Sequence, residues 1–150
     1  MSPGAARTVL AFDFGLRRIG VAVGNTLTET ARPLATLIAI AGNPDWQQIG
    51  RIRAEYPPDL CLVGVPCNTD GSEGVLAPRA RVFATELGRR VGCEVIMVDE
   101  SLSSHAADEV LRGERAAGSR VRRVRRGDVD QMAATLLLLQ WLRQPTARLG

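Results

Sequence analysis

Apolar residues along this chain gather in short, nearly continuous runs, and turn-forming residues bound each run. Runs of about four to eight apolar residues between Gly, Pro, Asn or Asp are typical of strands that are covered on both faces of a sheet. The pattern predicts strands at residues 8–14, 19–24, 34–40, 59–65 and 93–98. Because glycine accepts a tight turn, Gly15 allows the first two strands to form a hairpin.

Other segments show the apolar spacing and the end signals of helices. These segments cover residues 46–56, 76–91, 105–111 and 129–142. Asp45 is a candidate N-cap for the first, and Gly92 is placed to close the second. The order of elements predicts a single α/β domain over residues 1–150, with helices flanking a five-stranded mixed sheet that has an antiparallel hairpin half and parallel strands. Residues 1–7 and 144–150 are expected to be loose tails.

The composition excludes several classes of protein. None of the apolar runs approaches the roughly 20 residues that span a bilayer, and the first residues lack the features of a signal peptide. We therefore expect a cytoplasmic protein that does not contact membranes. With 3 Cys, no C-x-x-C motif and 1 His, the sequence does not indicate a zinc site. Cys61 and Cys93 lie within apolar runs and are interpreted as buried small hydrophobic residues.

The basic residues are concentrated in one segment. The net charge is only +3, and all 19 basic residues are Arg. Residues 115–126 contain no acid, and their arginines are Arg115, Arg120, Arg122, Arg123, Arg125 and Arg126. Because the guanidinium fork matches the geometry of phosphate, this segment indicates a polyanionic partner. A solvated loop without a partner is the alternative interpretation.

Acidic residues follow two of the predicted strands and open the last helix. Asp13 ends the first strand, Glu100 follows the strand at 93–98, and Asp130 lies one turn into the last helix, with Asp128 at its start. In this topology the strand ends and the helix start can meet at one edge of the sheet. Residues two apart on a helix diverge, so Asp128 and Asp130 are not expected to point into one site together. As an alternative, Asp13 caps a turn.

Clustered carboxylates indicate a cation, because they repel one another and raise each other's pKa values unless a positive charge is present. Oxygen ligands without a His or Cys cluster suit Mg²⁺ or Mn²⁺. Two such ions about 4 Å apart can activate a water and stabilise the leaving oxygen during phosphodiester cleavage. No protein nucleophile is then needed. His105 stands alone in the sequence and is interpreted as structural.

Four motifs in order resemble the YqgF family, which is also called RuvX. They are Asp13-Phe-Gly15 with Gly20, then Val63-Gly-Val-Pro-Cys-Asn-Thr-Asp-Gly71, then Asp99-Glu100 with Leu102-Ser103, and finally Asp128-Val-Asp130 leading to Ala133-Ala134. Residues 30–34 fit as well, and the resemblance covers about residues 8–143. It implies an RNase H-like fold, related to the RuvC Holliday-junction resolvases, and a nuclease that matures the 5′ end of pre-16S rRNA.

The resemblance also implies where the active site lies. Its carboxylates fall at Asp13, Glu100 and Asp130, and the loop around residues 68–71 and the Arg-rich segment are expected to flank the substrate. The sequence departs from the family at two positions. Ser101 stands where the family usually has Arg, which removes a phosphate-facing cation. Asp128 stands where it commonly has Lys, which adds a negative charge near the site.

The resulting hypothesis is a metal-dependent nuclease with two Mg²⁺ or Mn²⁺ ions. Asp13 would bridge the ions, Glu100 and Asp130 would each complete one ion's shell, and Asp128 is a further candidate ligand. The predicted nucleic-acid contacts are Arg17, Arg18, Asn68, Arg120, Arg122, Arg123, Arg125 and Arg126. The expected partner is precursor rRNA, with branched DNA and ribosomal particles as further candidates, and the protein is expected to be a monomer or a homodimer.

Three other functions stay open at this point. A resolvase acting on branched DNA would need a dimer with two sites, which the sequence does not show. A nucleic-acid-binding protein with a weakened active site would use the Arg-rich segment and cut nothing. An ATPase of the actin or hexokinase type shares an Asp-x-Gly near its N-terminus, but it needs two such domains around a nucleotide.

Overall fold

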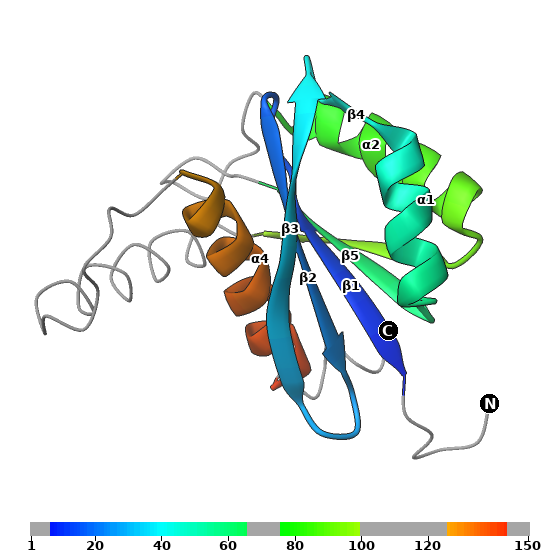
Figure 1. Ribbon diagram of the computed structural model, residues 1–150, viewed down its shortest axis with the longest axis vertical. Coiled ribbons are helices and arrows are strands. Elements are labelled where there is room, and N and C mark those ends of the chain that lie inside the picture. The colour runs from blue at the N-terminus through cyan, green and yellow to red at the C-terminus, as the bar shows by residue number, and fades with distance from the viewer. Residues whose placement is uncertain (1–6, 66–75, 100–125, 144–150) are drawn as a thin grey trace, which may run out of the picture.

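The computed structural model describes residues 7–65, 76–99 and 126–143 (Figure 1). The helix expected at 105–111 and nearly all of the two expected tails lie outside these ranges. Within them, the predicted mixed α/β architecture is confirmed. None of the helices in the described ranges is long and apolar enough to cross a membrane.

The sheet is mixed and has an antiparallel half and a parallel half. Its strands are β1 (Thr8–Asp13), β2 (Arg18–Asn25), β3 (Thr30–Ile40), β4 (Asn43–Pro44), β5 (Leu60–Val65) and β6 (Glu94–Asp99). They lie in the order β4-β3-β2-β1-β5-β6. The neighbours from β4 to β1 pair antiparallel, whereas β1 with β5 and β5 with β6 pair parallel.

The expected count of five strands is wrong by one, because β4 is an additional strand of only two residues. A tight turn with positive φ at Ala41 (52°) and Gly42 (87°) returns the chain along β3 and allows this short pairing. Strand β3 also begins at Thr30, earlier than expected, because pairing with β2 orders a segment whose polar residues and Pro33 hide the apolar pattern.

In the described ranges the helices that cover the sheet are α1 (Trp46–Glu55), α2 (Ala77–Val91) and α4 (Arg126–Leu142). The side chain of Asp45 caps α1 by accepting a hydrogen bond from the backbone N–H of Gln47 at 3.0 Å. Gly92 closes α2 in the left-handed conformation with φ of 77°. Both predicted caps are therefore confirmed. Helix α4 begins three residues before the expected 129, because apolar spacing does not mark its first turn.

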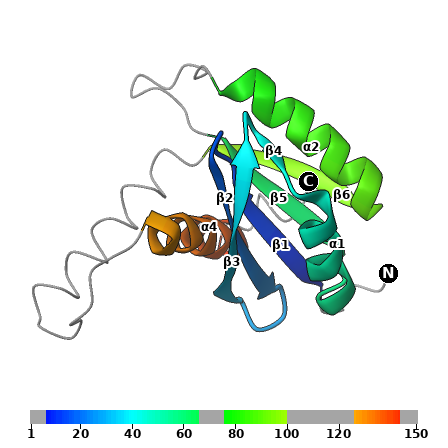
Figure 2. The same ribbon diagram turned by 45° about the horizontal axis from the view of Figure 1, so that its top comes forward.

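The sheet separates two hydrophobic clusters, and helices α1 and α2 lie on one face while α4 lies on the other (Figure 2). Side chains alternate between the faces along each strand. Leu10 and Phe12 of β1 therefore pack with the α1 and α2 side, whereas Val9 and Ala11 pack against α4. This alternation decides on which face each residue at a strand end is presented.

Helix α4 crosses β2 at unusually short range because the facing residues of β2 are small. These residues are Gly20, Ala22 and Gly24. A Cβ on Gly20 would lie 2.1 Å from the backbone oxygen of Asp130, and one on Gly24 would lie 2.7 Å from Cδ2 of Leu138. Any larger residue at either position would push the helix off the sheet, so the two glycines fix where α4 lies.

Candidate active site at the carboxyl edge of the sheet

Asp13 is the last residue of β1, and the strand alternation places it on the α4 face. Val9 and Ala11, four and two positions earlier, belong to the cluster under α4. In the sheet, Asp13 pairs with Gly20 on one side and Gly64 on the other. Neither neighbour has a side chain, yet Asp13 is only 9% exposed, so its carboxylate lies in a recess of the sheet edge.

Asp130 reaches the same corner of the sheet from the other end of the chain. Its backbone lies directly over Gly20, the cross-strand partner of Asp13. Gln131, the next residue, fastens this turn of α4 to the sheet, because its Nε2 donates to Oγ1 of Thr36 at 3.0 Å. Two of the three predicted catalytic carboxylates therefore lie on adjacent parts of one surface.

Arg18 adds a positive charge to this corner. It opens β2 on the face that also carries Gly20, and its Nε donates to Oδ2 of Asp130 at 2.9 Å. The two side chains are 31% and 21% exposed, so water partly screens the pair. An ion pair of this kind contributes about 0.2–1 kcal/mol to stability. Arg17, the other predicted phosphate contact in this turn, is exposed.

The donors at this corner fit a hard divalent cation in their chemistry. Asp13 and Asp130 offer carboxylate oxygens of the kind that Mg²⁺ and Mn²⁺ prefer. Within the described ranges, no group of three or more His, Cys, Asp or Glu residues is arranged to hold a metal ion. The third predicted ligand, Glu100, directly follows β6 and lies outside the described residues.

Most of the other predicted site residues also lie outside the described residues. They are Asn68, Arg120, Arg122, Arg123 and Arg125. Asp128 and Arg126 lie in the first turn of α4, where only the backbone is described. The Arg-rich segment thus leads directly into the helix that positions Asp130.

The sequence prediction missed two features of this corner: the ion pair between Arg18 and Asp130, and the close crossing at Gly20. A signal for the crossing was present, because small residues at every second position of β2 leave one face of the strand flat. Nothing in the sequence pairs Arg18 with a residue of the last helix, because that contact depends on where α4 crosses the sheet.

A mixed sheet in this order, helices on both faces and carboxylates at the end of the first strand and on the last helix define an RNase H-like domain. The family model described as "RuvX: Holliday junction resolvase" matches residues 7–144. The chain belongs to this RuvX family, as its motifs predicted.

Relatives of known sequence agree with this assignment. A protein of Nitrosococcus oceani is 48% identical over 141 residues, which cover 94% of this chain and 90% of that protein. A protein of Edwardsiella ictaluri is 47% identical over 135 residues, which cover 90% of this chain and 94% of that protein. Both carry the name "Putative pre-16S rRNA nuclease".

Solved structures support the fold. The RuvC protein of T. thermophilus in complex with a Holliday junction substrate matches with a TM-score of 0.53 and 19% identity, covering 96% of each chain. The yeast mitochondrial Holliday junction resolvase Ydc2 matches with a TM-score of 0.51 and 12% identity, covering 90% of this chain and 77% of that one. At these identities the similarity establishes the RNase H-like fold.

Proposed function

We propose that this protein is a cytoplasmic, metal-dependent nuclease that cleaves phosphodiester bonds in precursor rRNA at the 5′ end of pre-16S rRNA. The observation that supports the proposal is the crossing of α4 over Gly20, where the backbone of Asp130 lies over the cross-strand partner of Asp13. The names of relatives that are 47–48% identical supply the substrate class.

The proposed site holds two Mg²⁺ or Mn²⁺ ions. Asp13, Glu100 and Asp130 would hold them, with Asp128 as a further ligand. When bound, the ions supply activation of a water molecule and neutralisation of charge at the phosphate. The recess around Asp13 fixes the position of its carboxylate, because the sheet holds the backbone on both sides.

Arg18 has two roles in this proposal. In the structure it neutralises Asp130. Its guanidinium has further N–H donors beyond Nε, which can bind a phosphate oxygen of the substrate while the pair with Asp130 holds the side chain in place. Arg17 is exposed on the same turn and would contact the next phosphate. Asn68, Arg120, Arg122, Arg123, Arg125 and Arg126 are proposed to bind the substrate farther from the scissile bond.

A Holliday junction resolvase is the second candidate. It is favoured by the description of the family model and by the shared fold with RuvC and Ydc2. Such an enzyme must cut two opposed strands of a junction, so it requires two copies of the site at a fixed spacing. The two functions therefore differ in substrate and in oligomeric state.

Cleavage assays on two substrates test the proposal. A labelled single-stranded RNA with the 16S 5′ leader and a four-way DNA junction are each incubated with Mg²⁺ or Mn²⁺. We expect the protein to cut the RNA, and Asp13→Asn to reduce the rate by at least about 10³-fold, because a proposed carboxylate ligand of the ions is lost. Glu55→Gln, which neutralises an exposed carboxylate of α1, is the matched control and should cut normally.

Each outcome separates the candidates. If only the junction is cut, the protein is a resolvase. If neither substrate is cut but both bind in a salt-dependent manner, the protein is a binding protein that has kept the fold. If Asp13→Asn cuts as fast as the wild type while its thermal unfolding is unchanged, the assignment of the carboxylate is wrong.

A further inference from the structure

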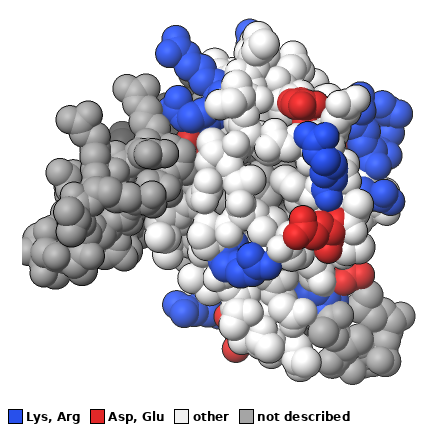
Figure 3. All heavy atoms as spheres, in the orientation of Figure 1, with Lys and Arg blue, Asp and Glu red and all other residues white. Residues whose placement is uncertain are grey.

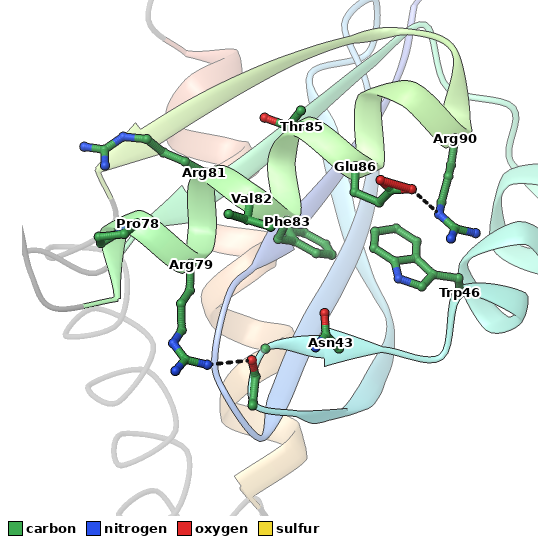
Figure 4. A pocket seen from close by; sticks show the side chains of 12 residues that line it. Asn43, Trp46, Pro78, Arg79, Arg81, Val82, Phe83, Thr85, Glu86 and Arg90 are labelled. Carbon is green, nitrogen blue, oxygen red and sulfur yellow. Dashed lines mark hydrogen bonds and ion pairs between the residues drawn. The ribbon is translucent and has the colours of Figure 1, made fainter.

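A groove lies on the sheet face opposite the carboxylates, between α2, the turn that joins β3 to β4, and the start of α1 (Figure 4). Its volume is about 830 Å³. Arg79, Val82, Phe83, Glu86 and Arg90 follow one another along the side of α2 that lines it. Apart from the adjacent Val82 and Phe83, these residues are three or four positions apart and so form a single stripe on the helix.

The groove begins at the same edge of the sheet as the proposed active site. The backbone N–H of Gly42 donates to the oxygen of Leu16 at 3.0 Å, so the turn at the mouth of the groove touches the segment that follows Asp13. The ring of Phe14 also packs under this turn, 3.0 Å from where a Cβ on Gly42 would lie. A nucleic-acid strand bound at the proposed active site can therefore extend over the β1–β2 turn into the groove.

Arginines stand at both ends of the stripe. Arg79 lies near the sheet edge, where its Nη1 donates to the backbone oxygen of Ala41 at 3.0 Å. Arg90 lies eleven residues farther along α2, which is about 16 Å at 1.5 Å per residue. The one carboxylate between them, Glu86, accepts hydrogen bonds from Arg89 and Arg90, which lower its pKa. Three arginines, Arg79, Arg81 and Arg90, line the groove against this one carboxylate, so the lining carries a net positive charge that attracts anions.

The far end of the groove offers a platform for stacking. The rings of Trp46 and Phe83 stack with centroids 5.6 Å apart, and the guanidinium of Arg90 lies 4.7 Å from the centre of the Trp46 ring. Figure 4 shows the three side chains meeting at the α1 end of the groove. The side chain of Arg90 remains 46% exposed, so a planar group can stack on it. Val82, which is 69% exposed, adds apolar surface beside the platform.

We propose that this groove binds a single-stranded segment of the RNA substrate beyond the cleavage site, with phosphates on Arg79 and Arg90 and a base on the Trp46–Arg90 platform. The inference rests on the proposed function for the identity of the RNA. Proteins bind single strands without reading their sequence through cationic side chains that contact the backbone and planar groups on which bases stack. Figure 3 shows arginines on the side of the molecule where α1 and α2 lie, interspersed with acidic side chains.

Binding measurements on uncleaved RNA test the groove. The full chain with Asp13→Asn is titrated with labelled oligouridylates of about 4 and about 16 nucleotides, the range of site sizes of single-strand-binding domains. The groove variant is Arg79→Gln with Arg90→Gln. The matched control is Arg51→Gln with Arg143→Gln, which removes the same charge from exposed positions outside the groove.

We expect the groove variant to bind the longer RNA about tenfold more weakly and to lose most of the affinity gained with length. Its dependence of log affinity on log salt concentration should become shallower by about 1.4, because two phosphate contacts on a single strand are lost at about 0.7 each. The control pair should retain the length dependence. Equal effects of the two pairs, or no effect of the groove pair, would overturn the proposal.

Tryptophan fluorescence gives a second measurement that does not depend on the arginine variants. Trp141 belongs to α4 and is buried, whereas Trp46 lines the groove. The longer RNA should quench the emission of Trp46, and Trp46→Phe should remove the quenching. Displacement of the RNA by an oligoglutamate peptide of equal charge at equal concentration would instead identify a site for acidic peptides and contradict the proposal.

These measurements separate the groove from the proposed function. The binding assay uses a variant that is expected not to cut, so its result does not depend on catalysis. If the wild type does not cut the leader RNA but the groove pair alone weakens binding, the proposed function fails and the groove stands. If cutting is normal and the groove pair binds like the control pair, the groove proposal alone fails.

Discussion

The two faces of the sheet are packed in different ways, and each way suits a different task. On the α1 and α2 face, large side chains fill the space, and Phe83 of α2 touches the rings of Phe12, Phe14 and Trp46. On the α4 face, Gly20 lets the helix backbone touch the strand, and Gly24 leaves room for the side chain of Leu138. We call the α1 and α2 face, with its large side chains, the thick face, and the α4 face, with its glycines, the thin face. We expect the thick face to contribute mainly to stability and the thin face to fix the position of Asp130.

Substitution on the thick face should cause the largest loss of stability. Phe83→Ala removes a ring that contacts three others, so we expect the free energy of unfolding to fall by about 3–5 kcal/mol. Chemical denaturation measures this loss. Val82→Ala, on the exposed side of the same helix, should change it little. If Phe83→Ala unfolds at the same denaturant concentration as the wild type, the aromatic cluster is not a major source of stability.

Substitution on the thin face should affect activity more than stability. The added methyl group of Gly20→Ala would collide with the backbone of Asp130, so α4 must shift away from Asp13. We expect a stability loss of about 1–3 kcal/mol, together with a fall in RNA cleavage of at least about 100-fold, because small displacements of catalytic groups have effects of this size.

Gly50→Ala in α1 is the matched control for this glycine. A Cβ at Gly50 would meet no atom within 4 Å, so alanine should stabilise the helix by about 0.5–1 kcal/mol and leave cleavage unchanged. If Gly20→Ala loses stability and activity only in proportion, so that its folded fraction cuts normally, the thin face does not position Asp130.

A smaller effect is expected when the ion pair on the thin face is removed. Arg18→Gln should lower the free energy of unfolding by less than about 1 kcal/mol, because the pair is partly exposed. It should also bind Mn²⁺ several-fold more tightly, since a positive charge next to Asp130 is lost. Paramagnetic resonance of free Mn²⁺ measures this affinity, with Arg51→Gln as the control. Weaker Mn²⁺ binding would show that Asp130 is not a ligand.

The smallest effect concerns two thiols at the amino end of the parallel strands. The Sγ atoms of Cys61 and Cys93 lie 3.6 Å apart. The bond to Cys93 and burial raise the pKa of the Cys61 thiol, while the bond from Cys61 lowers the pKa of Cys93. In a Cys67→Ser background, we expect iodoacetamide to label Cys93 increasingly as pH rises and to spare Cys61.

The same thiols give a weak dependence of stability on pH. Folded Cys61 keeps its proton, whereas the unfolded chain loses it near the ordinary thiol pKa of about 8.5, so the Cys61 contribution to stability falls above that pH. The lowered pKa of Cys93 acts in the opposite direction. Denaturation of Cys61→Ser should therefore be less sensitive to alkaline pH than that of the wild type. In the labelling experiment, equal reaction of Cys61 and Cys93 with iodoacetamide would contradict the opposite pKa shifts of the two thiols.

The sequence predicted the strands with continuous apolar runs, because such runs are long enough to show a buried segment. It missed β4, whose two residues include Pro44 and look like a chain break. It predicted that Asp13 ends a strand and that Asp130 lies within the last helix, and the structure confirms both positions. It also read Cys61 and Cys93 as equally buried, whereas only Cys61 is fully buried.

The contacts among these residues could not be predicted in the same way. The pair between Arg18 and Asp130 joins positions 112 residues apart, and it exists only because Gly20 sets the height of α4 over the sheet. Local patterns describe what each segment prefers, whereas the distance between two packed layers depends on all the side chains between them.

The order of the site residues along the chain has a consequence for synthesis. Asp13 is made near the beginning and Asp130 more than a hundred positions later, after β5, α2 and β6. A chain is synthesised from its N-terminus at about 5–20 residues per second. Asp130 is therefore added to the chain several seconds or more after Asp13. A nascent chain therefore lacks a complete copy of the proposed site, and we expect the protein to be inactive until α4 has left the ribosome and has docked on the sheet.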